Sequence, residues 1–154
     1  MSKSRVRLKV KLDESPTEKA GLIKQGYTTY RSPQGADGGV DILAGAGPLG
    51  FGTPQLCVEV KSDGSPIDRP TVDKLIGAVT KFGAHEGLFV SWSGFKTNVQ
   101  KELAASFFRV RLWTQKDLLE QLFAHYDHLD EDLRAECQFA GWHVNPTAPS
   151  RALR

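Results

Sequence analysis

Cysteine, long apolar runs and an excess of charge of either sign are all scarce in this sequence. Only two cysteines, Cys57 and Cys137, occur among 154 residues. They are far apart and match no metal-binding spacing, so we predict buried thiols in a reducing compartment. No apolar run is long enough to cross a bilayer, and residues 1–14 contain no apolar core flanked by charge. We therefore expect a cytoplasmic protein with no signal peptide and no membrane partner.

The charges nearly balance, with 20 basic and 18 acidic side chains and a formal net charge of +2. So small an excess neither requires nor excludes a nucleic-acid partner, and the local grouping of charges has to decide. Arg5–Leu12 is one such group, because basic and apolar residues alternate there with the period of a strand. Two interpretations stay open for it, an edge strand protected by its charge and a ribbon that contacts phosphates.

Apolar periodicity predicts a single α/β domain. Apolar residues make up 40% of the chain and charged residues 25%, as is typical of globular proteins. The order of a helix, three strands, then alternating helices and strands predicts a mixed central sheet flanked by helices, with an αβββαβ core. We expect one domain over residues 1–142, with its core at about 15–124, and a loose tail over 143–154. The predicted strands lie at 27–30, 40–43, 55–61, 87–92 and 109–113, and the predicted helices at 16–25, 69–82, 96–107, 114–123 and 129–139.

Local signals define several of these boundaries. Ser15–Glu18 has the form of a capping box with proline at the first helical position, which predicts a short helix that stops at Gly26. Gly83 closes the helix predicted over 69–82. Residues 44–54 contain four glycines and two prolines, so we predict a flexible turn or hairpin tip there.

The run Gln55–Lys61 (QLCVEVK) is the most convincing central strand. Successive side chains of a strand point to opposite faces. Glu59 and Lys61 are therefore predicted to project together from one face, while Val58 and Val60 enter the core. A carboxylate and an ammonium group placed side by side at a strand end suggest a site.

A second short apolar run, Val40–Leu43, carries Asp41. If the two runs pair as an antiparallel hairpin, Asp41 comes to lie near Glu59. Magnesium prefers oxygen ligands and keeps several waters, so two carboxylates and the Val60 carbonyl would suit it. Lys61 would then hold or activate the attacking water in phosphodiester hydrolysis.

A purely structural interpretation of the same residues also stays open. A triplet of the form D/E-x-K arises by chance roughly once in a chain of this length at average composition. Glu59, Val60 and Lys61 would then form only a charged strand end with a surface ion pair. Asp41, eighteen positions upstream, is what makes the pattern more specific.

The segment Gly35–Ile42 (GADGGVDI) resembles the GxDGGxD element of Mrr-type restriction endonucleases. The likeness covers about two thirds of the chain, from Gly26 to Phe123, with its motifs in the right order and spacing. It continues through VEVK at 58–61, VDKLIGA at 72–78, GLFVSWSGF at 87–95 and on through 112–122. A GADGGVD stretch followed by a strand-borne EVK is a fairly specific combination.

This resemblance implies the PD-(D/E)xK nuclease fold, a Mg²⁺ cofactor that Mn²⁺ can replace, and cleavage of double-stranded DNA. Asp41, Glu59 and Lys61 fall on the family's catalytic positions. Many Mrr-type enzymes have glutamine at the position of Glu59; the glutamate matches the wider superfamily and should favour metal binding. Asp37 falls on the family's other loop aspartate, and we interpret it as shaping the loop.

The predicted first helix departs from the family pattern. It is short and lacks the aromatic residue that precedes a glutamate in the family, and neither Glu14 nor Glu18 fits the spacing well. Family members also often carry a separate DNA-reading domain, so we expect target selection to come from a partner subunit or another segment. Because two cuts across a duplex need two active sites, we expect a homodimer or a larger assembly.

Two alternatives to a restriction-type nuclease stay open. One is a nucleic-acid-binding or assembly module that keeps the nuclease fold without turnover. The other is a structure-specific nuclease that resolves DNA junctions.

Overall fold

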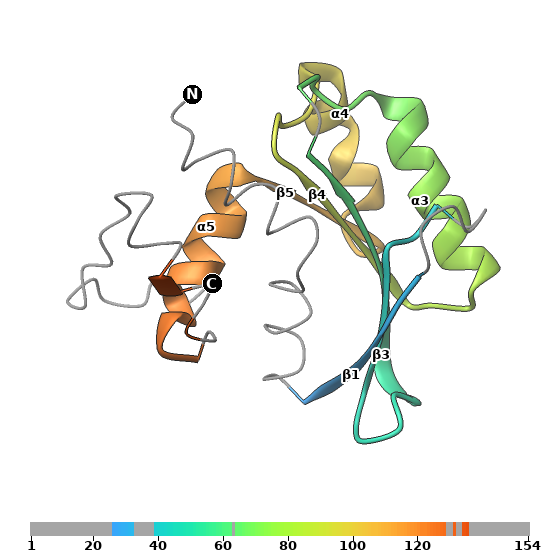
Figure 1. Ribbon diagram of the computed structural model, residues 1–154. Helices are drawn as coiled ribbons and strands as arrows, with labels where there is room; N and C mark the ends of the chain where they lie inside the picture. The colour runs from blue at the N-terminus through green and yellow to red at the C-terminus, as the bar shows by residue number, and fades with distance from the viewer. Residues whose placement is uncertain (1–25, 33–38, 63, 129–130, 132–133, 136–154) are drawn as a thin grey trace.

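A five-stranded sheet with helices on both faces forms the body of the molecule (Figure 1). The computed structural model describes residues 26–32, 39–62, 64–128, 131 and 134–135. The elements are β1 (Tyr27–Arg31), β2 (Ile42–Ala46), β3 (Gly52–Lys61), α3 (Arg69–Lys81), β4 (Glu86–Ser91), α4 (Thr97–Glu102), η1 (Leu103–Ser106), β5 (Val110–Thr114), α5 (Gln115–Ala124) and η2 (Tyr126–His128). The predicted α/β class with a mixed central sheet is confirmed.

The strands follow one another across the sheet in the order β1-β2-β3-β4-β5. β1, β2 and β3 form an antiparallel meander, whereas β3, β4 and β5 run parallel. Parallel neighbours need a crossover connection, which α3 supplies between β3 and β4, and α4 with η1 supplies between β4 and β5. The carboxyl ends of the three parallel strands therefore meet at one edge of the sheet, opposite the β2–β3 hairpin tip (Figure 1).

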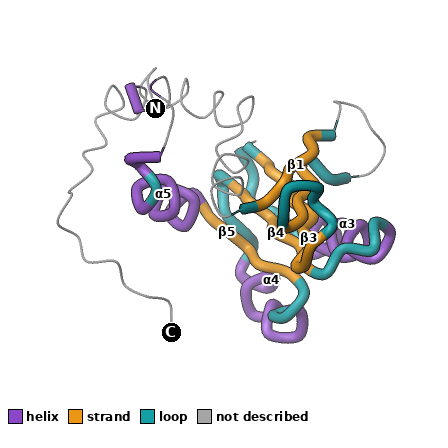
Figure 2. Tube along the Cα trace, turned by 90° about the horizontal axis from the view of Figure 1, so that it is seen from below, coloured by secondary structure: helices purple, strands orange, loops and turns teal. Residues whose placement is uncertain are grey.

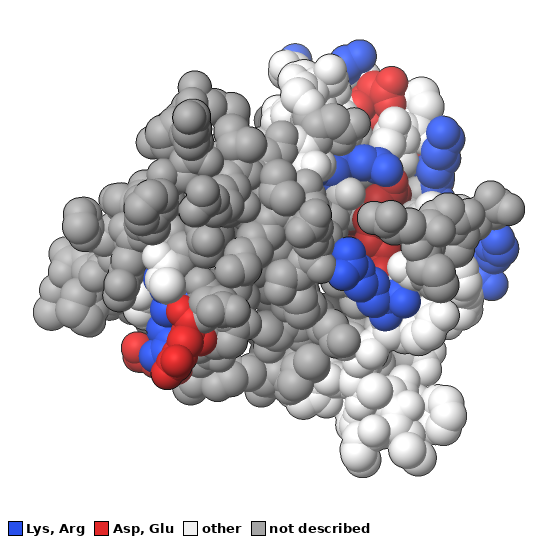
Figure 3. Space-filling view, viewed as in Figure 1, with Lys and Arg blue, Asp and Glu red and all other residues white. Residues whose placement is uncertain are grey.

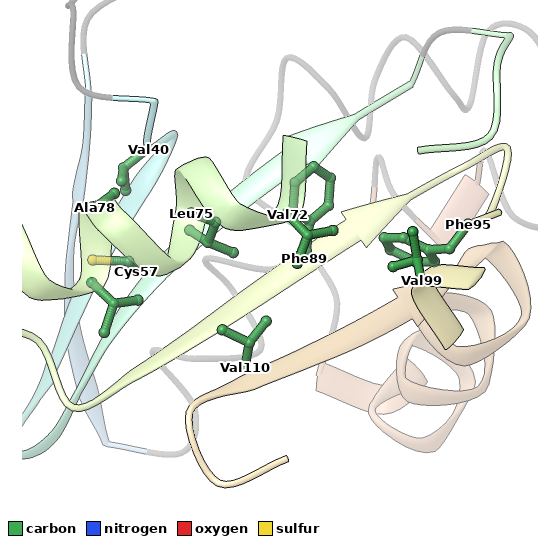
Figure 4. Packing of buried hydrophobic residues seen from close by; sticks show 10 residues of the cluster. Val40, Cys57, Val72, Leu75, Ala78, Phe89, Phe95, Val99 and Val110 are labelled. Carbon is green, nitrogen blue, oxygen red and sulfur yellow. The ribbon is translucent and has the colours of Figure 1, made fainter. Parts of the chain in front are cut away.

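Two apolar layers hold the sheet between its helices. One layer, under α3 and α4, consists of Val40, Cys57, Val72, Leu75, Ala78, Val79, Phe89, Phe95, Val99 and Val110 (Figure 4). The other consists of Ile42, Val58, Val90 and Leu118 and packs α5 across the sheet from α3 (Figure 2). The adjacent residues Cys57 and Val58 enter different layers and are both 0% exposed, so β3 is buried on both faces.

The predicted buried thiol is confirmed for Cys57, and burial raises the pKa of that thiol to about 11. A thiol in this state is inert at neutral pH, because the reactive form is the thiolate. Cys137 lies outside the described residues.

Helix α3 matches its prediction to within one residue because its ends carry strong local signals. Asp68 caps the first turn and accepts hydrogen bonds from the Thr71 N–H at 3.2 Å and the Thr71 hydroxyl at 2.6 Å. Pro70 lies in the first turn, where no backbone donor is needed. Gly83 follows the helix with a φ of 65°, as the predicted stop requires.

The β2–β3 hairpin differs from its prediction. β2 begins at Ile42 and continues to Ala46, and β3 begins at Gly52, so most of the flexible turn predicted over 44–54 is strand. Gly45 permits this tight hairpin, because a Cβ there would overlap the backbone carbonyl of Gly50.

The amphipathic helix predicted over 96–107 is wrong in its second half. α4 ends at Glu102 and continues as the 3-10 helix η1. Phe107, the last residue of the predicted helix, is 47% exposed, and the Arg111 guanidinium lies 3.7 Å from its ring centroid. Val99 is the only buried residue of α4, and a single anchor does not hold a long helix on the sheet.

Several predictions fall outside the described residues. They concern the strand over 5–12, the helix over 16–25, most of the helix over 129–139 and the tail over 143–154. Among the helices that the structure describes, none has both the length and the apolar character that a membrane span needs.

A pair of glycine substitutions tests the hairpin geometry. Gly45→Ala should destabilise the protein by about 1–3 kcal/mol, because the new methyl group displaces the Gly50 backbone. Gly77→Ala is the matched control on an exposed position of α3 with nothing within 4 Å of the new Cβ. It should stabilise the protein by roughly 0.5–1 kcal/mol. Urea unfolding measures both, and equal effects of the two changes would contradict the tight hairpin.

Candidate active site

The start of β2 and the end of β3 bring Asp41 next to Glu59 and Val60. The two strands pair antiparallel with Ile42 opposite Val58, so the predicted hairpin is confirmed. Just before β2, the Asp41 Oδ2 accepts a hydrogen bond of 2.6 Å from the Val60 N–H. The Asp41 N–H donates to the Val58 carbonyl at 2.9 Å. These bonds hold the Asp41 carboxylate against the backbone of β3.

Glu59 is a buried carboxylate, and only one of its two oxygens has a partner among the described residues. The residue is 6% exposed, and its Oε1 lies 3.4 Å from the Lys61 Nζ. Its Oε2 is buried and has no hydrogen-bond partner within the described part of the chain. Burial raises the pKa of Glu59, the neighbouring Lys61 lowers it, and the nearby Asp41 raises it again. A buried charge with an unpaired oxygen is costly for folding alone, which favours a role in binding a cation.

Lys61 projects from the same face of β3 as Glu59, at the carboxyl edge of the sheet. It pairs in register with Ser91 of β4. The Lys61 side chain is 41% exposed, whereas the Glu59 side chain is 8% exposed. A surface ion pair would leave both groups in water. The EVK triplet is therefore more than a charged strand end with a surface ion pair. The Lys61 side chain is therefore partly exposed beside a buried carboxylate.

The oxygens gathered here suit a hard divalent cation. The Asp41 carboxylate and the unpaired Glu59 Oε2 are two such donors. The N–H and carbonyl of one strand residue point to the same side, so the Val60 carbonyl points toward the Asp41 side as its N–H does. Among the described residues no group of three His, Cys, Asp or Glu side chains gathers. A cation here would therefore have two carboxylates, one carbonyl and waters, a set typical of Mg²⁺.

A further charged residue acts on this site, and the sequence pattern did not single it out. Burial raises the pKa of Glu59, and Lys74 of α3 opposes that rise together with Lys61. In sequence Lys74 is an ordinary helix-surface lysine beside the buried Leu75, so only its place in the fold distinguishes it. The other acids considered from sequence, Glu14, Glu18 and Asp37, lie outside the described residues.

Solved structures with this arrangement of elements include restriction endonucleases. The DNA modification-dependent restriction endonuclease AspBHI matches with a TM-score of 0.59 and 17% identity over 86% of this chain and 38% of that chain. The MspJI restriction endonuclease, in complex with a 27-mer oligonucleotide, matches with a TM-score of 0.52 and 20% identity over 86% of this chain and 32% of that chain. AF1548, a protein of unknown function, matches with a TM-score of 0.51 and 14% identity over 82% of this chain and 76% of that chain. The fold is therefore restriction-endonuclease-like, as the sequence predicted.

The sequence match defines the family. The Mrr_cat restriction endonuclease family matches residues 19–122, more than half of the chain. The chain therefore belongs to this family and contains a nuclease domain of the restriction endonuclease type, which confirms the resemblance seen in its motifs. No curated protein matches the sequence.

Proposed function

We propose that this domain hydrolyses phosphodiester bonds in double-stranded DNA as a magnesium-dependent endonuclease of the Mrr restriction type. The observation that carries the proposal is the buried Glu59 carboxylate, one oxygen of which has no partner among the described residues, beside Asp41 and the partly exposed Lys61. Membership of the restriction endonuclease family supports the reaction class. The structural likeness to MspJI, which was solved with an oligonucleotide, supports DNA as the substrate.

Asp41, Glu59 and the Val60 carbonyl would hold the cation. A magnesium ion bound there would polarise the phosphate and lower the pKa of a coordinated water. The Val60 N–H holds one oxygen of Asp41 at 2.6 Å, so the other oxygen is left for the cation. Burial of Glu59 adds to the attraction, because a carboxylate away from water interacts more strongly with a cation than an exposed one does.

Lys61 would act on the reacting groups. Its Nζ is anchored 3.4 Å from Glu59 Oε1, which fixes the ammonium beside the metal ligands. From that position the ammonium can orient the attacking water and offset charge that develops on the phosphate. The exposed part of the side chain leaves room for the DNA strand to approach.

Target selection should come from outside this domain. The chain spans 38% of AspBHI and 32% of MspJI, so a nuclease of that size would hold much besides the catalytic unit. We propose that residues 1–142 fold as one catalytic domain and that a separate domain or subunit reads the target. Two cuts across a duplex require two such sites, which favours a homodimer.

The test is cleavage of supercoiled plasmid. Wild-type protein with magnesium should convert the plasmid to nicked and linear forms, EDTA should abolish this, and manganese should restore it. An intact plasmid together with tight duplex binding would overturn the nuclease proposal in favour of a binding module. Strong preference for a branched substrate over linear duplex would instead identify a junction-resolving nuclease.

A further inference from the structure

The two flanks of α3 face different parts of the sheet. Its buried residues are Val72, Leu75, Ala78 and Val79. With 3.6 residues per turn, Ala78 lies at one edge of this buried stripe with Lys74 beyond it, and Thr80 lies on the other flank. The contacts made by Ala78 and Thr80 therefore decide which way Lys74 faces.

Arg109, just before β5, donates a hydrogen bond of 3.0 Å to the Thr80 hydroxyl, so that flank faces β5. Ala78 belongs to the same apolar layer as Val40 and Cys57, and Figure 4 shows the three side by side. The flank that carries Ala78 and Lys74 therefore faces β2 and the Asp41 carboxylate that precedes it.

Lys74 also lies at the level of the active-site carboxylates. α3 crosses over between the parallel strands β3 and β4, so it runs antiparallel to β3. From Ala78 back to Lys74 the helix rises about 6 Å, and from Cys57 on to Glu59 the strand rises about 7 Å. Because Ala78 and Cys57 belong to the same apolar layer and lie near each other in Figure 4, Lys74 comes level with Glu59.

The surface around this flank combines both signs of charge. In the space-filling view, Lys and Arg side chains surround Asp and Glu side chains on the α3 side of the molecule (Figure 3). Lys74 is exposed, and no carboxylate in the described part of the chain lies within ion-pair distance of it. An exposed ammonium group at this position can attract an anion that approaches the two carboxylates.

We propose that Lys74 binds a backbone phosphate of the DNA strand at the active site, from the α3 side. This inference rests on the proposed endonuclease function. Two carboxylates repel a polyanion, and a cation at their level offsets that repulsion before the strand is engaged. Lys61 would then act on the reacting phosphate and its water, and Lys74 would hold the strand in place.

The experiment compares Lys74→Ala with Lys116→Ala. Lys116 lies on α5 across the sheet, its side chain is 84% exposed, and its loss changes the net charge equally. Binding of a fluorescent duplex is measured by anisotropy over a series of salt concentrations, with calcium in place of magnesium. Lys74→Ala should weaken binding about fivefold to tenfold and reduce the slope of log affinity against log salt by about 1. Lys74→Arg should restore both values, and Lys116→Ala should match wild type.

Kinetics with magnesium supply a second measurement. Lys74→Ala should raise KM for duplex more than it lowers kcat, because the contact exists before the chemical step. Wild-type binding and kinetics in Lys74→Ala would overturn the role of Lys74 while leaving the nuclease proposal intact. Weaker binding with an unchanged salt slope and no rescue by arginine would also overturn it. A wild type that neither binds nor cleaves duplex would overturn both proposals.

Discussion

Asp41→Asn should reduce magnesium-dependent cleavage on the order of a thousandfold, a loss of about 4 kcal/mol in transition-state stabilisation. The asparagine oxygen can still accept the 2.6 Å hydrogen bond from the Val60 N–H, so the hairpin should keep its geometry. What disappears is one of the two negative charges that we propose hold the cation. Calorimetry should therefore show loss of magnesium binding together with the loss of cleavage, at a nearly unchanged melting temperature.

Lys61→Ala is the matched variant that separates metal binding from chemistry. This variant should also abolish cleavage, but it should retain its affinity for magnesium. Glu59 and Asp41 remain in place, and the Lys61 ammonium, which lies 3.4 Å from Glu59 and would compete with the metal ion, has been removed. Cleavage by Asp41→Asn at the wild-type rate would remove Asp41 from the metal site. Magnesium binding lost equally in both variants would contradict the division of roles between the carboxylates and the lysine.

Phe89→Ala should lower the free energy of unfolding by roughly 3–5 kcal/mol. Phe89 is 0% exposed in β4 and packs edge-to-face on Phe95, with ring centroids 5.7 Å apart. The change leaves a cavity in the layer that supports α3 and α4 and removes the aromatic contact. Since a domain of this size has only about 5–15 kcal/mol of net stability, the variant should be poorly folded at 37 °C.

Phe108→Ala is the control for this prediction, because Phe108 is 86% exposed. It should change the free energy of unfolding by about 0.5 kcal/mol or less. Urea unfolding followed by circular dichroism gives both values on one scale. A loss under about 1 kcal/mol for Phe89→Ala would show that the layer beneath α3 is not the stabilising core described above.

Periodicity and local end signals located the elements that the structure describes, although not all of their ends. Alternation along Gln55–Lys61 placed Glu59 and Lys61 on one face, and helical spacing with a terminal glycine located α3 to within one residue. The hairpin and α4 were predicted less well. Whether a glycine-rich segment is strand or turn depends on how closely Gly45 approaches Gly50 across the hairpin, and such a contact has no periodic signature.

The sequence by itself determined the class of sheet, the family and the identity of the two carboxylates and the lysine at the candidate site. These depend on local alternation and on motifs whose residues are close together in the chain. Only the tertiary structure decided that Glu59 is buried, with one oxygen that has no partner among the described residues, and that the flank of α3 carrying Lys74 faces the side of β2. The burial of Glu59 and the direction in which a flank of α3 faces depend on which distant elements pack together. The free energy of a charged group depends in turn on all the groups that surround it.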